Sequence, residues 1–444
     1  MLFPGAARAL YSAGMWLAQP LLRAKLRRRG RAEPGYLEAT GERFGHYADN
    51  APPPGTPASP LVWIHAVSLG ETRAAAGLVA ELRQQLPGMR LLLTHGTATG
   101  REEGKKLLLP GDLQAWQPWD TPGAVARFLA RFQPSAGVLM ETEVWPNLVA
   151  GCRAAGVPLA LANARLSARS LRSAQRLAAL SGAAFAGLAA VWAQSDDDAA
   201  RLRVLGAPVS GVFGNLKFDA APDAALLARG RQWRAEAGRP VALFASSREG
   251  EEVLWLDAIA EKWQAGQGQG GELPAVQWLL VPRHPQRFDA VARLLEERGL
   301  RVSRRSTWPV DTAPAPADVW LGDSLGEMAL YYGLADAALL GGSFVPLGGQ
   351  NLIEAAACGC PVVMGPSTFN FAEASALAEA AGAALRVDGM PTGVAAVEAL
   401  VADVARVAAA RDAALAFAAA HRGAARRTAE AVSGLLSLRA PAAR

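Results

Sequence analysis

Short apolar runs alternate with helical stretches along most of this 444-residue chain, and this alternation limits the possible folds more than any other feature. Helical patterns follow the first series of runs, for example over residues 72–86 and 146–155. A strand–helix repeat of this kind predicts a parallel sheet with helices on both faces. The runs of this first series are Leu61–Val67, Leu91–Thr94, Ala136–Met140, Leu159–Ala162 and Ala190–Ala193.

A second series of runs predicts a second domain of the same kind. A chain of this length is longer than a domain built around a single hydrophobic core usually is. The region 206–240, rich in Gly, Pro and Asp turns, is the candidate linker, and the Ala-rich tail from 391 to about 432 is expected to be helical. Two such domains facing each other predict a cleft between the carboxyl ends of their sheets, where ligands bind. The second series comprises Val241–Ala245, Trp278–Pro282, Val319–Leu321, Ala338–Gly341 and Pro361–Met364.

Composition and charge narrow the class of protein. Hydrophobic residues make up 51% and charged residues 19%, which is typical of a globular chain. Three cysteines suit a reducing compartment better than a disulfide scaffold. Residues 1–31 hold seven Lys/Arg and no acid, whereas the rest carries 38 basic against 40 acidic residues. The net charge of +5 therefore reflects one segment, which argues against a nucleic-acid partner.

The N-terminal segment is apolar first and basic afterwards, the reverse of a secretory signal peptide. Arg8, Gly14 and Pro20 weaken it as a membrane-spanning helix. We therefore predict a helix that lies in or dips into a membrane, with the basic cluster on anionic headgroups. The positive-inside bias would keep the remaining chain cytoplasmic. The alternative is a helix packed on the domain with a solvated basic face.

Carboxylates follow two of the predicted buried strands. Glu71 comes after a Ser-Leu-Gly turn, and Glu141 and Glu143 follow the strand 136–140. Carboxyl ends of parallel strands are where such sheets bind ligands, so these acids are candidate catalytic groups. Lys217 lies near the domain junction and is a candidate cation for the same site. The alternatives are a helix-dipole contact for Glu71, a helix cap at 141–143, and a surface position for Lys217.

The second domain shows features of a phosphate site. Gly-rich turns follow apolar runs and precede helices, so backbone N–H groups and helix dipoles are expected at the ligand. Arg283 supplies positive charge, and Glu354, three residues after Asn351, is a candidate for ribose hydroxyls. The acidic triplet 196–198 resembles a D-x-D metal motif, but it opens a helix, where acids commonly cap. The sequence predicts no metal site.

Taken together, seven motifs resemble the 3-deoxy-D-manno-octulosonic acid (Kdo) transferases of Gram-negative lipopolysaccharide synthesis. These motifs are WIHAVSLGE, ETEVWPNL, NARLS, GNLKFD, VPRHPQRF, LGE and GGSFVPLGGQNLIEAA. The resemblance implies an α/β GT-B fold with two Rossmann-like domains and a cleft between them. The expected parts are a membrane-associated segment (1–32), an acceptor domain (33–212) and a CMP-sugar domain (213–432).

The resemblance also implies an activity: inverting transfer of Kdo from CMP-Kdo to a lipid A precursor at the cytoplasmic face of the inner membrane, with no cofactor and no metal. Glu71 matches the family's general base, and Glu141 and Lys217 match positions that stabilise the transition state. One departure is Ser247-Arg248, where many relatives carry Thr-His. The implied donor-binding residues are Pro282, Arg283, Leu325, Gly326, Glu327, Asn351, Leu352, Ile353 and Glu354.

Two other functions remain open at this point. Another GT-B enzyme, either a UDP-sugar transferase or a 2-epimerase, would predict binding of UDP rather than CMP, and would leave the N-terminal segment without a purpose. An inactive membrane-bound sugar-nucleotide scaffold would be compatible with the fold, but Glu71, Glu141 and Lys217 argue against it.

Overall fold

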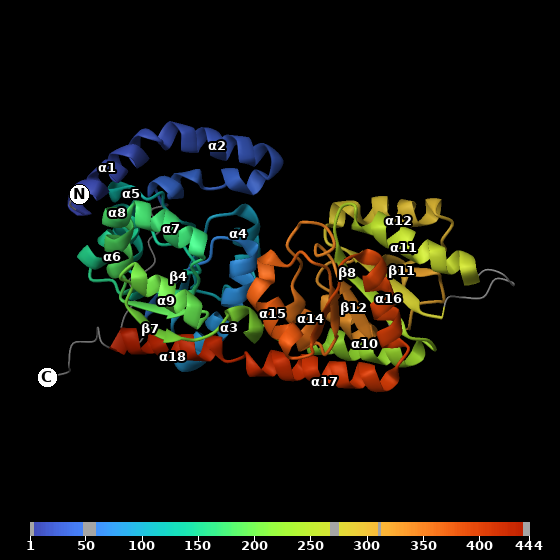
Figure 1. The fold of residues 1–444 in the computed structure, drawn as a ribbon. Helices are drawn as coiled ribbons and strands as arrows, with labels where there is room; N and C mark the ends of the chain where they lie inside the picture. The colour runs from blue at the N-terminus through green and yellow to red at the C-terminus, as the bar shows by residue number, and fades with distance from the viewer. Residues whose placement is uncertain (1–3, 48–58, 267–274, 310–311, 438–444) are drawn as a thin grey trace. The chain divides into compact units, whose positions relative to one another are not determined.

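The fold of the chain is taken from a computed structural model, which describes residues 4–47, 59–266, 275–309 and 312–437 (Figure 1). The chain forms two compact units. Unit 1 comprises residues 1–220 and 422–444, and unit 2 comprises residues 221–421. Within the described residues each unit holds one seven-stranded sheet, in which every strand pairing is parallel.

In unit 1 the strand order is β3-β2-β1-β4-β5-β6-β7. The order reverses between β1 and β4, so the loops that follow these two strands lie at the topological switch point, where open α/β sheets bind ligands. The strands are β1 (Leu61–His65), β2 (Arg90–His95), β3 (Leu113–Trp116), β4 (Ala136–Met140), β5 (Leu159–Ala164), β6 (Ala190–Ala193) and β7 (Val209–Val212).

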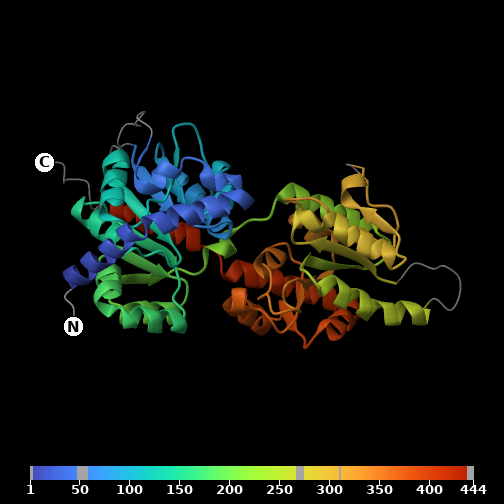
Figure 2. The same cartoon turned by 90° about the horizontal axis from the view of Figure 1, so that it is seen from above.

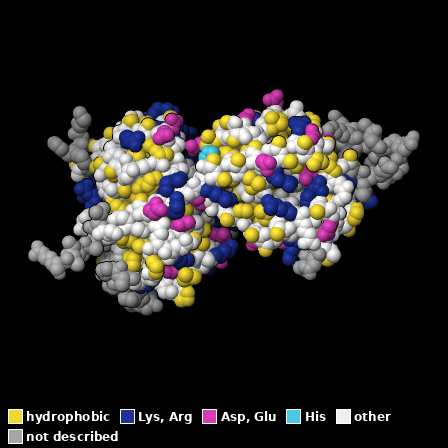
Figure 3. Space-filling model, turned by 90° about the horizontal axis from the view of Figure 1, so that it is seen from below, with side chains coloured by type: hydrophobic (Ala, Val, Ile, Leu, Met, Phe, Trp, Pro, Cys, Tyr) yellow, Lys and Arg dark blue, Asp and Glu magenta, His cyan; other side chains and the backbone are white. Residues whose placement is uncertain are grey.

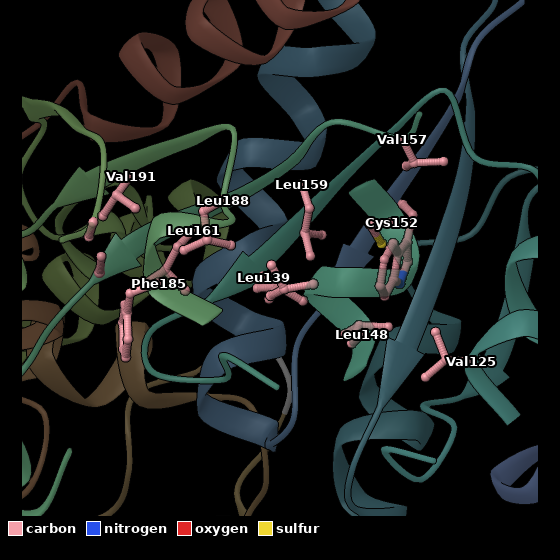
Figure 4. Packing of buried hydrophobic residues seen from close by; sticks show 14 of the residues in the cluster. Val125, Leu139, Leu148, Cys152, Val157, Leu159, Leu161, Phe185, Leu188 and Val191 are labelled. Atoms are coloured by element: carbon pink, nitrogen blue, oxygen red, sulfur yellow. The ribbon is translucent and has the colours of Figure 1, made fainter. Parts of the chain in front are cut away.

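Helices cover both faces of this sheet. They are α1 (Pro4–Leu17), α2 (Gln19–Ala32), α3 (Leu69–Gln85), α4 (Ala98–Lys105), α5 (Pro122–Phe132), α6 (Pro146–Ala154), α7 (Ala168–Arg176), α8 (Ala178–Ala186), α9 (Asp196–Val204) and α18 (Ala424–Ser437), with 3-10 turns η1 (Pro34–Leu37), η2 (Thr40–Phe44) and η3 (Leu216–Asp219). One core lies between the sheet and α5, α6, α8 and α9, and the other lies between the sheet and α3 and α18. In Figure 4, Leu139 and Leu159 from the strands lie close to Leu148 and Cys152 of α6.

In unit 2 the strand order is β10-β11-β9-β8-β12-β13-β14, with the reversal between β8 and β12. The strands are β8 (Val241–Ser247), β9 (Gln277–Pro282), β10 (Val302–Arg304), β11 (Val319–Leu321), β12 (Ala337–Leu340), β13 (Val362–Met364) and β14 (Ala384–Arg386). The helices are α10 (Ala224–Glu236), α11 (Glu251–Gly266), α12 (Phe288–Glu297), α13 (Met328–Leu334), α14 (Leu352–Ala357), α15 (Ala372–Ala380), α16 (Met390–Val401) and α17 (Val404–Ala420), with 3-10 turns η4 (Pro285–Arg287), η5 (Arg305–Thr307) and η6 (Phe369–Phe371).

The boundary between the units, after residue 220, falls inside the predicted linker 206–240, although that region also contains β7, η3 and α10. The units differ from the expected domain ranges in their extent. The second domain was expected to run from 213 to 432, yet residues 213–220 and α18 belong to unit 1. Helix α18 belongs to unit 1 because a residue distant in sequence caps its N-terminus: Asp219 accepts hydrogen bonds from the backbone N–H groups of Gly423 and Ala425 at the start of α18. With its N-terminus held there, α18 packs its apolar face on α3 (Figure 1).

The N-terminal helices lie on the outside of unit 1, where α1 contacts α6 and α8 (Figure 2). None of residues 5–17 is buried, and large apolar side chains on α1 such as Leu10, Trp16 and Leu17 are 63–69% exposed. Across the described ranges, no helix has both the length and the apolar character to cross a bilayer. Residues 1–3 of the predicted membrane segment lie outside the described residues.

Charge elsewhere on the surface is mixed. On the face drawn in Figure 3, Lys and Arg side chains lie among Asp and Glu side chains over each unit. The acidic triplet opens α9, as expected of a capping sequence: the Ser195 hydroxyl accepts from the Asp198 N–H at 3.2 Å, and Asp197 and Asp198 pair with Arg201. Asp198 also accepts from the Leu166 N–H at 2.8 Å, so two of the three carboxylates have partners within unit 1.

Candidate active site

Glu71 lies at the switch point of unit 1, in the first turn of α3. The Ser68 hydroxyl caps this helix, and Glu71 reaches back so that its Oε2 accepts from the Val67 N–H at 2.8 Å and its Oε1 from the Ser68 hydroxyl at 3.0 Å. Glu71 thus also occupies the first turn of the helix, as the helix-dipole alternative requires. This position does not exclude catalysis, because these two bonds hold the carboxylate in a defined orientation at the ligand-binding edge of the sheet.

The pKa of Glu71 is raised from its ordinary value of 4.5 to about 7, chiefly by burial and also by the negative charges of Glu141 and Glu143, against the opposing hydrogen bonds from Val67 and Ser68. A carboxyl group with a pKa near neutrality can accept a proton and hold it, which is what general-base catalysis requires. The local electrostatics therefore suit Glu71 to proton transfer.

Glu141 and Lys217 form an ion pair beside this carboxylate. The Lys217 Nζ lies 3.3 Å from Glu141 Oε1, and both side chains are largely buried. Glu141 directly follows β4 and has a left-handed backbone, with φ of 59°. A non-glycine residue held in this conformation costs about 1–3 kcal/mol and is found most often at functional sites. The structure thus brings Glu71, Glu141 and Lys217 to the same edge of one sheet.

Glu143 lies in the same loop as Glu141. Its Oε2 accepts from the Trp145 indole N–H at 2.9 Å, and burial raises its pKa. Its charge contributes to the raised pKa of Glu71, so the two acids of the Glu-Thr-Glu motif act on the site in different ways.

Asn163 is a site residue for which the sequence predicted no role. It follows Ala162, which pairs with Met140, so it lies opposite Glu141, and it is also left-handed, with φ of 51°. Its Oδ1 accepts from the Leu216 N–H at 3.0 Å, next to Lys217. Asn163 is 2% exposed, and its Nδ2 has no hydrogen-bond partner among the described residues. The signal was the NARLS motif, which places polar side chains where a strand ends.

His65 and His95 were also missed, since the histidines show no pattern along the chain. Both are buried at the carboxyl ends of β1 and β2, and burial lowers the pKa of His65 to about 3 and of His95 to about 4. The His95 Nδ1 lies 3.0 Å from the Ala66 carbonyl oxygen, so in the neutral ring it donates there and supports the turn before Glu71. Both rings are neutral at pH 7, so neither brings a positive charge to this site.

The predicted donor residues of unit 2 lie on three loops at the carboxyl edge of its sheet. Pro282 and Arg283 are at the end of β9, residues 325–327 follow β11, and residues 351–354 begin α14 after the long loop from β12. The Arg283 guanidinium donates to Gln350 Oε1 at 3.2 Å, which joins the first loop to the third. Leu352 and Ile353 are 1% and 2% exposed, so their side chains belong to the core and only their backbone could meet a ligand.

The other two donor loops carry acidic groups. Glu327 pairs with Arg305 at 2.8 Å and accepts a hydrogen bond from Ser324, while Leu325 is 71% exposed and Gly326 has φ of 81°. Asn351 caps α14 by accepting from the Ile353 N–H at 3.2 Å, one turn before Glu354. These features can position the backbone and acidic oxygens for ribose or base contacts.

Two buried acids that the sequence did not single out shape these loops. Glu251 accepts from the N–H groups of Arg248, Gly342 and Phe344 at 2.7–3.0 Å, and burial raises its pKa. Glu252 accepts from Ser247 and from Arg287. Ser247 and Arg248, where the sequence departs from the family pattern, are therefore both held by hydrogen bonds to buried carboxylates.

A metal centre is not apparent in the part of the chain that the structure describes: no group of three or more His, Cys, Asp or Glu side chains there could hold a metal ion. The two neighbouring cysteines of the second unit, Cys358 and Cys360, are buried where α14 ends.

Comparisons with known proteins identify the family of the chain. A family model described as 3-Deoxy-D-manno-octulosonic-acid transferase (kdotransferase) matches residues 38–220. The 3-deoxy-D-manno-octulosonic acid transferase of Bordetella pertussis is 49% identical, over 97% of this chain and 99% of that protein. The enzyme of the same name from Haemophilus influenzae is 34% identical, over 82% and 84%.

A solved structure supports the fold independently. A glycosyltransferase from Rickettsia africae aligns with a TM-score of 0.56 at 11% identity, covering 86% of this chain and 100% of that one. The fold of two parallel-sheet α/β units is thus shared with that protein. The family model and the two sequence relatives show that the chain is a glycosyltransferase. It belongs to the 3-deoxy-D-manno-octulosonic acid transferase family.

Proposed function

We propose that this protein transfers Kdo from CMP-Kdo to a lipid A precursor with inversion at the anomeric carbon. The observation that carries the proposal is Glu71, a carboxylate at the switch point of unit 1 whose pKa is raised to about 7. Family membership supports the sugar that is transferred, and the donor loops of unit 2 support the nucleotide.

In the proposed reaction, a sugar hydroxyl of the acceptor attacks the anomeric carbon of Kdo while Glu71 takes the hydroxyl proton. The new C–O bond forms as the bond between that carbon and the phosphate oxygen breaks, and CMP leaves with the electron pair. A single displacement needs one base and inverts the anomeric centre, by the same logic as inverting glycosidases. A positioned base of this kind typically contributes about 10²–10⁴-fold.

The remaining charged groups have distinct proposed roles. Lys217, held by Glu141, would stabilise negative charge that develops in the transition state, and Arg283 would bind the CMP phosphate. The leaving group carries one phosphate and less charge than a diphosphate, so we propose that the reaction uses neither a metal nor a cofactor. Asn351 and Glu354 would contact the nucleoside.

We also propose that α1 and α2 place the enzyme on the cytoplasmic face of the inner membrane, where a lipid acceptor would lie. The exposed Leu10, Trp16 and Leu17 would enter the interface, and the basic side chains of α2 would lie on anionic headgroups. Binding to vesicles that contain phosphatidylglycerol should exceed binding to pure phosphatidylcholine vesicles and should weaken with salt.

The decisive assay is transfer from CMP-Kdo, generated in situ, to a lipid A precursor without added metal, with the added sugars counted by mass spectrometry. Glu71→Ala should abolish the mass gain. Glu102→Gln removes an exposed carboxylate on α4 of the same unit and should retain it. If folded wild-type protein transfers no Kdo but binds UDP more tightly than CMP, the proposal fails in favour of a UDP-sugar enzyme.

A further inference from the structure

A groove in unit 1 lies beside α1, against α5 and α6. It has a volume of about 990 Å³, within the range of sites that bind small molecules. Its walls are mostly small or apolar side chains, and of its lining residues only Arg8 is ionisable. We call this cavity the α1 groove; its lining includes Ala9, Val125, Ala126, Leu129, Ala150 and Ala154.

Polar contacts, rather than apolar packing, attach α1 beside this groove. The Ser12 hydroxyl donates to Asn147 Oδ1 at 3.0 Å, and Tyr11 hydrogen-bonds to Asp120, which itself caps the start of α6 through the N–H groups of Asn147 and Leu148. No residue from 5 to 17 is buried, so α1 does not fill the apolar space between itself and α5 and α6. The groove therefore offers apolar surface to a ligand from outside the chain.

The charges at the groove point to an anionic ligand. Arg8 lines both the α1 groove and a second pocket of about 250 Å³ between α1, α6 and α8, which Arg153 also lines. Within the described ranges neither guanidinium has an ion-pair partner. An apolar groove beside two unpaired cations matches the chemistry of one molecule with a hydrocarbon chain and a phosphate.

The position of the cations distinguishes a bilayer lipid from the sugar acceptor. Arg153 is the eighth residue of the nine-residue α6, so it lies about 10 Å along that helix from the end that meets the carboxyl edge of the sheet. Arg8 lies one turn of α1 before Ser12, which contacts Asn147 at the start of α6. Because Arg8 and Arg153 line the same second pocket, a phosphate held between both cations would lie along α6, toward its end farther from the loop that carries Glu141.

We propose that the α1 groove binds one acyl chain of an anionic glycerophospholipid of the bilayer, with the lipid phosphate against Arg8. This inference rests on the proposed membrane association and makes it more specific, since α1 would be held to unit 1 through a bound lipid as well as through its polar contacts. The lipid would complete the apolar packing that α1 lacks.

Photo-crosslinking tests this proposal on the full-length protein. The probe is phosphatidylglycerol with a diazirine at the end of one acyl chain, placed in phosphatidylcholine vesicles, and adducts are located by peptide mass spectrometry. We expect adducts on α5 and α6 around Ala126 and Ala154, as well as on α1. Replacing Arg8 by Gln should reduce the preference for phosphatidylglycerol over a matched phosphatidylcholine probe about fivefold.

A groove-filling variant provides the matched control. Ala126 and Ala154 are exposed, so Trp at both positions should fill the groove without entering the core, and adducts on α5 and α6 should fall at least tenfold. Ala408→Trp adds the same side chain at an exposed position on α17 and should leave the adducts unchanged. Because added Trp ordinarily strengthens membrane binding, a loss of adducts in the filled variant cannot come from weaker adsorption.

Three results would overturn the inference: adducts confined to α1, adducts on α5 and α6 that persist in the filled variant, or displacement of the probe by an equimolar lipid A precursor, which would assign the groove to the acceptor. Transfer activity is measured separately in detergent. Activity without groove adducts would refute the lipid site and leave the proposed function standing. Groove adducts without transfer activity would support the lipid site and refute the proposed function.

Discussion

Replacing Glu71 by Gln should stabilise the protein at alkaline pH while it removes catalysis. The folded-state pKa of about 7 lies above the ordinary 4.5, so the folded protein holds this proton more tightly than the unfolded chain does. The resulting stability is fully present below pH 4.5 and is lost as the pH rises through 7. A difference of about 2.5 pKa units corresponds to roughly 3 kcal/mol.

The variant escapes this loss because Gln carries no charge. Its weaker hydrogen bonds to Val67 and Ser68 cost about 1 kcal/mol at every pH, so the net gain in the free energy of unfolding at pH 8 should be about 2 kcal/mol. Urea denaturation of wild type and variant at pH 4 and pH 8 measures it. The change in their stability difference between these two pH values isolates the charge from the pH-independent bonds.

Activity supplies a second readout of the same group. If the ionised Glu71 is the base, wild-type kcat/KM should fall about tenfold per pH unit below pH 7 and level off above it. The Gln variant should lose about 10²–10⁴-fold at its optimum. A stability difference that does not change between pH 4 and pH 8 would refute the raised pKa, and full activity of the Gln variant would refute the assignment of the base.

Substitutions at three further positions test other parts of the two units. Lys217→Met breaks the ion pair with Glu141 and should lower kcat at least tenfold. Acceptor binding, measured separately by lipid titration, should change little. An equal loss of acceptor binding would mean that Lys217 binds the substrate in the ground state and does not act specifically on the transition state. Asn163→Ala should destabilise unit 1 by about 2 kcal/mol in urea denaturation, because it loses the hydrogen bond from the Leu216 N–H and strains the left-handed backbone. Asn163→Gly should recover part of this loss, since glycine adopts that backbone without strain. Equal stability of the two variants would contradict the backbone argument. Gly341→Ala should destabilise unit 2 by more than 1 kcal/mol in the same assay, since a Cβ there would lie 2.1 Å from the Ser246 carbonyl oxygen. An unchanged free energy of unfolding would mean that the backbone at Ser246 can move aside without cost.

Glu71 shows how a residue in the first turn of a helix can also be the proposed catalytic base. The Ser68 hydroxyl and the Val67 N–H orient its carboxylate, while burial and two nearby acids keep its pKa near neutrality. These two hydrogen bonds limit the rotamers of the side chain, and the surrounding charges set its protonation. A position in the first helical turn and a proposed catalytic role are therefore not exclusive alternatives for this residue.

The sequence by itself determined the central strands of both sheets. All ten predicted runs correspond to strands, because a central strand of a parallel sheet is covered on both faces and requires a nearly continuous apolar run. The four strands that the pattern missed, β3, β7, β10 and β14, are the outermost strands of the two sheets. They are only partly buried, so their residues need not be apolar and their sequence carries little strand signal.

The sequence also determined where the catalytic candidates lie, because a residue that follows a predicted strand must lie at the carboxyl edge of the sheet. Only the tertiary structure decided what surrounds them. The raised pKa of Glu71 depends on burial and on acids about 70 residues away, and the position of Lys217 depends on Asn163 and on a helix cap that joins Asp219 to α18. Such contacts bring together residues distant along the chain, and local periodicity carries no information about them.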